Sequence, residues 1–224
     1  MIPPCPVCRF EACLEFISVD RLDYWRCPRC QARFLDPAQR PDRQRERAEY
    51  DLHQNSVDDP NYRKFLLPLF KALTDRLPPG SEGLDFGCGP GPALAAMLRE
   101  AGYQISLFDP FYAPEPGVLE RSYDFITCTE VVEHLHHPAT VFERLNACLR
   151  PGGWLGVMTR FQTEDARFAQ WHYRRDPTHV VFYREETFRW LANEFGWQCT
   201  ITPPDQALLQ KTPRPDGFGQ AARS

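Results

Sequence analysis

Along positions 60–211, short apolar runs alternate with segments whose apolar residues recur at helical spacing. Apolar runs bounded by Gly, Pro or Asp are typical of strands, whereas apolar residues at i, i+3 and i+4 indicate helices. We expect strands at 83–86, 104–108, 123–128 and 154–159. We expect helices at 62–77, 93–101, 138–149 and 185–195, and a closing hairpin of 198–202 with 207–211. This alternation predicts an α/β fold.

The first of these strands runs into a turn that is rich in glycine. Residues 84–91 read Leu-Asp-Phe-Gly-Cys-Gly-Pro-Gly, and Asp85 is the carboxylate just before the turn. Glycine permits positive φ and lets the backbone approach a ligand closely. Pro92 suits the first position of the helix that follows. The order strand, turn, helix predicts a ligand at the carboxyl end of the strand.

The spacing of these glycines differs from that of a dinucleotide-binding turn. The pattern here is G-x-G-x-G, whereas dinucleotide folds prefer G-x-G-x-x-G. Asp85 would repel a pyrophosphate, but its charge suits the ammonium group of a methionine moiety. The second strand ends in Asp109, about 20 residues past the glycines, where an acidic residue suits two ribose hydroxyls.

Together these features resemble the class I S-adenosylmethionine (SAM)-dependent methyltransferases. The resemblance implies a Rossmann-like sheet and SAM as the cofactor. It implies that SAM is bound by Asp85, Gly87, Cys88, Gly89, Gly91, Asp109, Thr129 and Glu130, with Asp109 on the ribose. The chain departs from the family at 110–121, where the family normally has a helix, a strand and another helix. We interpret 118–120 as a remnant of the third strand and assign no residue to adenine.

The strand at 123–128 leads into a second group of chemically active side chains. Glu130, Glu133 and His134 have the spacing i, i+3 and i+4, so on one helical turn they would share a face. That face would begin at the carboxyl end of a central strand, where a ligand would sit. Two carboxylates and an imidazole packed together require a cation, a shared proton or a role as a base.

The E-V-V-E-H motif resembles the ubiquinone-biosynthesis O-methyltransferases and also the small-RNA 2′-O-methyltransferases. There, the motif and one later histidine hold a divalent cation, and His179 matches that histidine in position. The resemblance implies that Glu130, Glu133, His134 and His179 bind Mg²⁺ or Mn²⁺. Without a metal, His134 or His179 would be the general base, with Glu130 beside them in the catalytic group. A structural alternative is that Glu133 and His134 only hydrogen-bond the nearby backbone.

Residues 1–38 show a separate pattern built on four cysteines. Cys5, Cys8, Cys27 and Cys30 give the spacing C-x2-C-x18-C-x2-C, at which four thiolates can surround one Zn²⁺. Between the pairs, 14–19 and 22–26 predict a hairpin. This resembles a zinc ribbon, in which the metal is structural because no coordination position is open. Iron in the same site and unligated thiols are the alternatives.

Composition and charge bound the remaining choices. The 224 residues include 42% apolar ones, enough for one packed domain and a small appendage. No apolar run is long enough for a membrane span, and the first residues lack a signal-peptide pattern, so we expect a cytoplasmic protein. A net charge of −4 argues against a general affinity for nucleic acid. No pattern indicates an oligomeric state.

We divide the chain into four parts: a zinc-ribbon-like module (1–38), a linker helix (39–59), a SAM-dependent methyltransferase domain (60–211) and a disordered tail (212–224). Two further segments have alternative interpretations. Tyr50 and His53 are either a lid over the cofactor or part of a solvated helix face. Residues 171–175 are either an acceptor-binding wall or aromatic filling at the edge of the core.

The expected function is methyl transfer from SAM to a hydroxyl, or to a carbon, of a small-molecule acceptor. One alternative is an RNA 2′-O-methyltransferase that uses the ribbon to dock its substrate. Another is a non-catalytic SAM-binding scaffold, supported only by the short segment after Asp109.

Overall fold

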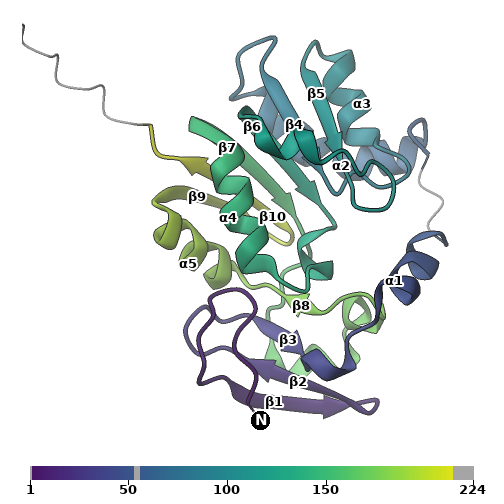
Figure 1. Ribbon diagram of the computed structural model, residues 1–224, viewed down its shortest axis with the longest axis vertical. Coiled ribbons are helices and arrows are strands. Elements are labelled where there is room, and N and C mark those ends of the chain that lie inside the picture. The colour runs from purple at the N-terminus through teal and green to yellow at the C-terminus, as the bar shows by residue number, and fades with distance from the viewer. Residues whose placement is uncertain (1, 53–55, 214–224) are drawn as a thin grey trace, which may run out of the picture.

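The computed structural model describes residues 2–52 and 56–213, and its larger sheet has six strands (Figure 1). In spatial order these are β5 (Gln104–Phe108), β4 (Glu82–Phe86), β6 (Tyr123–Thr129), β7 (Leu149–Met158), β10 (Gln206–Lys211) and β9 (Trp197–Thr202). The first four are parallel, and β10 is antiparallel to both β7 and β9. The α/β, Rossmann-like sheet with its closing antiparallel hairpin is therefore confirmed.

Helices cover both faces of this sheet. They are α2 (Pro60–Thr74), α3 (Ala93–Glu100), α4 (Pro138–Cys148) and α5 (Glu185–Phe195). Because side chains alternate along a strand, Phe125 packs with the leucines of α2 and α3, and Ile126 packs with α4 and α5. Gly196, with φ of 66°, ends α5 in the left-handed conformation that glycine adopts readily.

The expected remnant of a third strand is wrong. Residues Pro116–Glu120 form a short 3₁₀ helix, η2, rather than a strand. The Tyr123 hydroxyl donates to the Val118 carbonyl at 2.7 Å, which ties this helix to the start of β6. As a result β5 is an edge strand of the sheet.

A second sheet is built mainly from the N-terminal residues. It consists of β1 (Leu14–Val19), β2 (Leu22–Arg26), β3 (Arg33–Leu35) and β8 (Val181–Phe182). The hairpin of β1 and β2 has the predicted bounds. β8 was not predicted, and it belongs to the chain between β7 and α5, so one strand of the small sheet comes from the larger domain. Figure 1 shows the small sheet below the larger one, with β8 at the junction.

The two sheets share a hydrophobic core. Phe34 and Tyr24 of the small sheet belong to the same buried cluster as Phe142 of α4 and Phe188 of α5. Between the two sheets the chain forms a 3₁₀ helix, η1 (Pro37–Gln39), and then α1 (Arg43–Tyr50). Only α1 lies wholly within 39–59, the range expected for a linker helix. Most of the expected tail lies outside the described residues. None of the described helices is long and apolar enough to cross a membrane.

Candidate active site

A cavity of about 680 Å³ lies at the carboxyl ends of β4, β5 and β6. Of the residues predicted to bind SAM, all line it: Asp85, Gly87, Cys88, Gly89, Gly91, Asp109, Thr129 and Glu130. His134 and His179 line the same cavity, together with Asp176. The structure therefore brings the two groups of residues singled out from the sequence to one place.

The glycine turn has the conformation that its residues permit. Gly87 and Gly89 have φ of 75° and 61°, a region that other residues adopt with strain. A Cβ on Gly87 would lie 2.4 Å from a methyl group of Val131, so the backbone there packs too closely for a side chain. A Cβ on Gly89 would meet no atom within 4 Å, so this side of the turn opens to the cavity. A ligand in the cavity can therefore lie directly against the backbone of this turn.

Asp85 is the buried carboxylate beside this turn. It is 3% exposed, and the Thr127 hydroxyl donates to its Oδ1 at 2.7 Å. Burial raises the pKa of Asp85 to about 6, although the bond from Thr127 opposes that change. A cationic ligand group beside Asp85 would favour its charged form.

Asp109 is already engaged by the backbone. Its Oδ2 accepts from the Gly89 amide at 3.1 Å, and its Oδ1 accepts from the amides of Phe111 at 2.8 Å and Tyr112 at 3.1 Å. Asp109 thus ties the glycine turn to the loop after β5. Because Oδ2 accepts only one of these amides, it keeps a lone pair that a ribose hydroxyl could use.

Glu130 does not lie on one helical turn with Glu133 and His134, so that expectation is wrong. Glu130 has φ of 51°, and the following 3₁₀ helix, η3, covers only Val132–His134. The Tyr173 hydroxyl donates to Glu130 Oε2 at 3.1 Å. Burial raises the pKa of Glu130 to about 9, and the nearby carboxylate of Glu133 adds to the effect. Its surroundings therefore favour the protonated form of Glu130.

Glu133, His134 and His179 form a compact cluster. Each offers a ligand atom, and these atoms lie within 4.8 Å of one another. Glu133 is 0% exposed, and neither of its carboxylate oxygens has a hydrogen-bond partner among the described residues. A buried carboxylate without partners is strongly destabilising unless a cation or proton compensates it. The cluster has the ligand types that a divalent cation accepts.

The backbone fixes which nitrogen of each histidine is free. Thr178 O lies 3.2 Å from His134 Nδ1, and Tyr173 O lies 2.7 Å from His179 Nδ1. A carbonyl oxygen can only accept, so each Nδ1 carries the proton and each Nε2 keeps its lone pair. Burial lowers the pKa of His134, which keeps its ring neutral. Both Nε2 atoms can therefore bind a metal or accept a proton.

Helix α1 forms one wall of the cavity. Glu46 and Tyr50 line it, and the Tyr50 ring meets the His134 ring edge-on with centroids 5.3 Å apart. Glu46 Oε1 lies 2.9 Å from His136 Nε2. Tyr50 is thus placed over the site, as the lid interpretation expects, whereas His53 lies outside the described residues. The sequence did not single out His136. It did not single out Glu46 either, because Glu46 lies in a run of basic residues.

Residues 171–175 lie outside the cavity and contact residues that line it. None of them is among the described residues that line the cavity. Trp171 packs on Phe168 and Phe182, which agrees with the core-edge interpretation. Tyr173 is 9% exposed and contacts Glu130 and His179. The sequence shows that Tyr173 is in this segment, but it gives no sign of its contacts with Glu130 and His179.

The four cysteines of the N-terminal module converge on one point. Their sulfurs lie within 4.8 Å of one another, with Cys5 Sγ 3.6 Å from Cys30 Sγ and Cys8 Sγ 3.4 Å from Cys27 Sγ. Sulfurs held tetrahedrally at ~2.3 Å from zinc would be ~3.8 Å apart. The two C-P-x-C turns are alike, since the residue after each, Arg9 and Gln31, has φ near 60° and donates back to the first cysteine's carbonyl.

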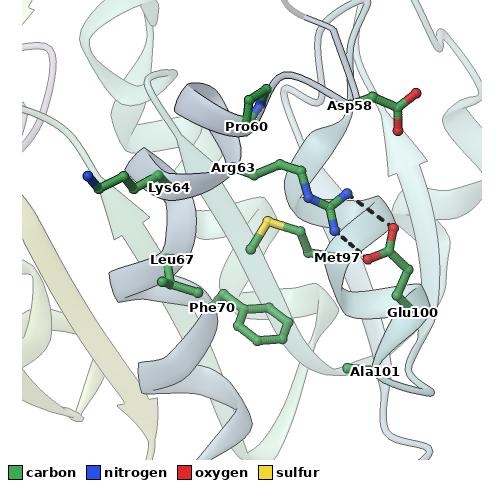
Figure 2. Close-up of a pocket in the computed structure, with 9 residues that line it drawn as sticks. All are labelled: Asp58, Pro60, Arg63, Lys64, Leu67, Phe70, Met97, Glu100 and Ala101. Carbon is green, nitrogen blue, oxygen red and sulfur yellow. Dashed lines mark hydrogen bonds and ion pairs between the residues drawn. The ribbon is translucent and has the colours of Figure 1, made fainter.

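A second groove lies on the outer side of α2 and α3 (Figure 2). Its volume is about 610 Å³, and Leu67, Phe70 and Met97 form its apolar floor. Arg63 and Glu100 on its rim form an ion pair with each other. The residues predicted to bind SAM and the two histidines line the first cavity instead, so we place the active site there.

The sequence matches known proteins over its larger domain. Residues 59–201 match a family model described as a methyltransferase domain. A ubiquinone biosynthesis O-methyltransferase of Paraburkholderia xenovorans (strain LB400) is 42% identical over 107 residues, covering 36% of this chain and 44% of the relative. The same enzyme of Xanthomonas campestris pv. campestris (strain B100) is 27% identical over 115 residues, covering 39% and 46%. These matches span less than half of each relative's length.

The fold is also similar to a solved structure. The 1,6-didemethyltoxoflavin-N1-methyltransferase of Burkholderia thailandensis, with bound 1,6-didemethyltoxoflavin and S-adenosylhomocysteine, has a TM-score of 0.56 and 14% identity. The similarity covers 88% of this chain and 99% of that chain. At this identity the likeness concerns the fold alone.

Proposed function

The chain belongs to the methyltransferase-domain family, and from that premise we propose that it transfers a methyl group from SAM to a hydroxyl of a small-molecule acceptor. The observation that carries the proposal is the shared cavity. The glycine turn with Asp85 forms one end of it, and His134 and His179 form the other.

When bound, SAM supplies an electrophilic methyl group. Asp85 would hold the ammonium group of the methionine moiety, and Asp109 the ribose. The open side of Gly89 leaves room for the cofactor against the backbone. Tyr62 and Phe65, also on the cavity wall, would help to exclude water from it. An enclosed cavity lets an acceptor be held in line with the methyl group, which is the main catalytic requirement of such a transfer.

A hydroxyl acceptor must lose its proton, and the histidine pair is suited to that task. His134 Nε2 and His179 Nε2 both keep a lone pair, because each Nδ1 faces a carbonyl oxygen. We propose that a divalent cation such as Mg²⁺ or Mn²⁺, held by Glu133, His134 and His179, lowers the acceptor's pKa. Without such a cation, His134 or His179 would be the general base. Glu130 would contribute as a proton-bearing group at the edge of the site.

The charge of the cavity favours a small molecule over RNA. Among the described residues that line the cavity, none is Arg or Lys, whereas five are Asp or Glu: Glu46, Asp85, Asp109, Glu130 and Asp176. Binding to a phosphate backbone depends on Lys and Arg side chains. An acidic, aromatic cavity instead suits a neutral aromatic acceptor.

We further propose that the four cysteines hold one structural Zn²⁺. The sulfur separations support this, because they are close to those of a tetrahedral thiolate site. Elemental analysis of the purified protein should give one zinc per chain, and the Cys30→Ser variant should give none. Iron in place of zinc would show itself in the same measurement.

Methyl-labelled SAM incubated with the protein and an extract of the host cell tests the main proposal. We expect label in the small-molecule fraction rather than in RNA or protein. Once zinc has been returned after EDTA treatment, Mn²⁺ or Mg²⁺ should restore the full transfer. Label in RNA would favour the RNA methyltransferase instead, and no label despite SAM binding would favour the scaffold.

The His179→Gln variant should reduce the labelled transfer by a factor of about 10² or more, because it removes the free Nε2 at the acceptor end. Its affinity for SAM should stay unchanged, since Asp85 and the glycine turn are intact. His137→Gln is the matched control, because His137 is exposed and its side chain does not cap α4. Equal transfer by wild type and His179→Gln would remove His179 from the mechanism.

A further inference from the structure

We propose that the N-terminal cysteine module (residues 2–35) positions the acceptor end of the active site, and so is a working part of the methyltransferase rather than an appended domain. The inference rests on the proposed function for the identity of the acceptor end. Three sets of contacts connect the module to Glu133, His134 and His179.

The first connection is a chain of backbone hydrogen bonds through Val180. The Leu35 amide of β3 donates to the Val180 carbonyl at 2.9 Å. The Val180 amide donates in turn to the Glu133 carbonyl at 2.8 Å. Val180 directly follows His179 and directly precedes β8, which pairs with β3. Val180, next to His179, is therefore bonded on one side to the small sheet and on the other to Glu133.

The second connection runs through side chains on the other flank of His179. Asp20, in the turn between β1 and β2, pairs with Arg174 at 2.6 Å, and the Arg174 side chain is only 3% exposed. Its neighbour Tyr173 accepts from His179 Nδ1 through its carbonyl and donates to Glu130 through its hydroxyl. Asp20 of the module thus neutralises the buried Arg174. Arg174 is next in sequence to Tyr173, whose carbonyl orients His179.

The third connection starts inside the first C-P-x-C turn. The Pro6 carbonyl accepts from the Ala139 amide at the start of α4, at 3.1 Å. On the far side of the cluster, Tyr183 donates from its hydroxyl to the Val132 carbonyl at 3.0 Å. The first contact holds the start of α4, which follows η3 in the chain, and the second holds Val132 of η3 itself. The metal-binding turn is therefore bonded to the helix that follows Glu133 and His134 in the chain.

The cofactor end has separate supports. None of residues 2–35 lines the cavity. The Gly87 and Cys88 amides donate to the Phe108 carbonyl of β5, and Asp85 is held by Thr127 of β6. Loss of the module's structure should therefore loosen the acceptor end and leave the cofactor end in place. This difference separates a positioning role from general support of the fold.

The first test removes zinc and follows hydrogen exchange in the full chain. The protein is treated with EDTA and then given Mn²⁺ without zinc, so that only the thiolate site stays empty. We expect amide exchange in residues 176–184 to rise by about tenfold or more, together with exchange in 14–35. S-adenosylhomocysteine should bind with an affinity within roughly threefold of the untreated protein, because the cofactor end is held by β5 and β6.

Two results would overturn the proposal. Unchanged exchange in 176–184 after zinc loss would show that the module does not hold the His179 segment. Loss of S-adenosylhomocysteine binding would show that the module supports the whole domain. Neither measurement needs an acceptor, so both stand even if the proposed methyl transfer fails.

The second test keeps the metal site intact. Asp20→Asn removes the charge that pairs with Arg174, at an exposed position whose φ of 53° asparagine tolerates. In the labelled-transfer assay, kcat should fall by about tenfold while KM for SAM stays unchanged. Asp23→Asn is the matched control, since in the described part of the chain the Asp23 side chain accepts from Ser18 and Gln39 and does not pair with Arg174. Equal kcat in wild type and Asp20→Asn would contradict the Asp20–Arg174 connection.

Discussion

Two buried carboxylates beside the cavity have very different surroundings. Asp85 accepts a hydrogen bond from Thr127 and opens toward the cofactor end, whereas Glu133 has no hydrogen-bond partner among the described residues. Both lie in positions where an unpaired negative charge is costly. Each is therefore suited to a cationic partner: Asp85 to the ammonium group of SAM, and Glu133 to a metal ion.

Asp85 should make the stability of the free protein depend on pH. Its folded-state pKa of about 6 lies above the ordinary value of 3.8, so the stabilising protonated form is present below pH ~4 and lost as pH rises through ~6. Asp85→Asn cannot ionise, so the variant should keep its stability as the pH rises. Its free energy of unfolding in urea should match the wild type near pH 4 and exceed it by about 1–3 kcal/mol at pH 8. Asp75→Asn, at an exposed position, should show no such difference, and a variant less stable at pH 8 would contradict the argument.

Glu133 should determine the response to divalent cations. Mn²⁺ or Mg²⁺ should raise the thermal midpoint of the wild type by several degrees, because a ligand that binds only the folded state stabilises it. Glu133→Gln should lose this response and should be at least as stable as wild type without the metal, since it removes a buried carboxylate that makes no hydrogen bond within the described residues. Glu194→Gln, at an exposed position on α5, should respond as wild type does. An undiminished cation response in Glu133→Gln would exclude the cluster as the binding site.

At the scale of single residues, the sequence predicted which side chains gather but not how. Asp85, Asp109, His134 and His179 were all identified, because each lies at the end of a strand or in a recognisable motif. The exclusion of Glu130 from the cluster was not foreseen. Motif spacing assumed an α-helical turn, whereas the chain leaves β6 through a left-handed residue and a 3₁₀ turn. Spacing alone does not encode that backbone conformation.

The elements show a similar division. Strand and helix positions of the larger domain follow from apolar periodicity, and the hairpin of β1 and β2 was predicted to the residue. β8 was not, because two residues carry no periodicity and its pairing with β3 joins positions about 150 apart in sequence. The position of α1 against the cavity was also hidden, since its residues read as a solvated, charged helix.

Helix α1 should become protected when the cavity is occupied. Arg43 and Arg47 lie over the Phe111 ring, 4.9 and 5.8 Å from its centroid, and Glu46 and Tyr50 line the cavity. A bound cofactor that contacts these side chains will stabilise α1 in this position. S-adenosylhomocysteine should therefore slow tryptic cleavage after Arg43, Arg45 and Arg47 by about fivefold or more. Cleavage after the exposed Arg167 is the internal control, and equal protection at both places would contradict a local effect.

For the whole molecule, the sequence pattern changes at residue 38, but the packing of the two parts is continuous across it. The small sheet contains a strand of the larger domain, and one buried cluster runs through both. Composition and cysteine spacing indicated two units, because each has its own pattern. They could not indicate the shared core, which depends on contacts between distant segments. Under the proposed function, the site would draw its cofactor end from one sheet and its acceptor end from the junction of two.

A calorimetric titration of SAM into the full chain tests the central claim most directly. We predict one site per chain for the wild type, and an affinity weaker by about 10–100-fold for Asp85→Asn, because a charged hydrogen bond contributes ~1.5–3 kcal/mol. Absence of binding by the wild type, or equal binding by Asp85→Asn, would contradict the assignment of this cavity to SAM.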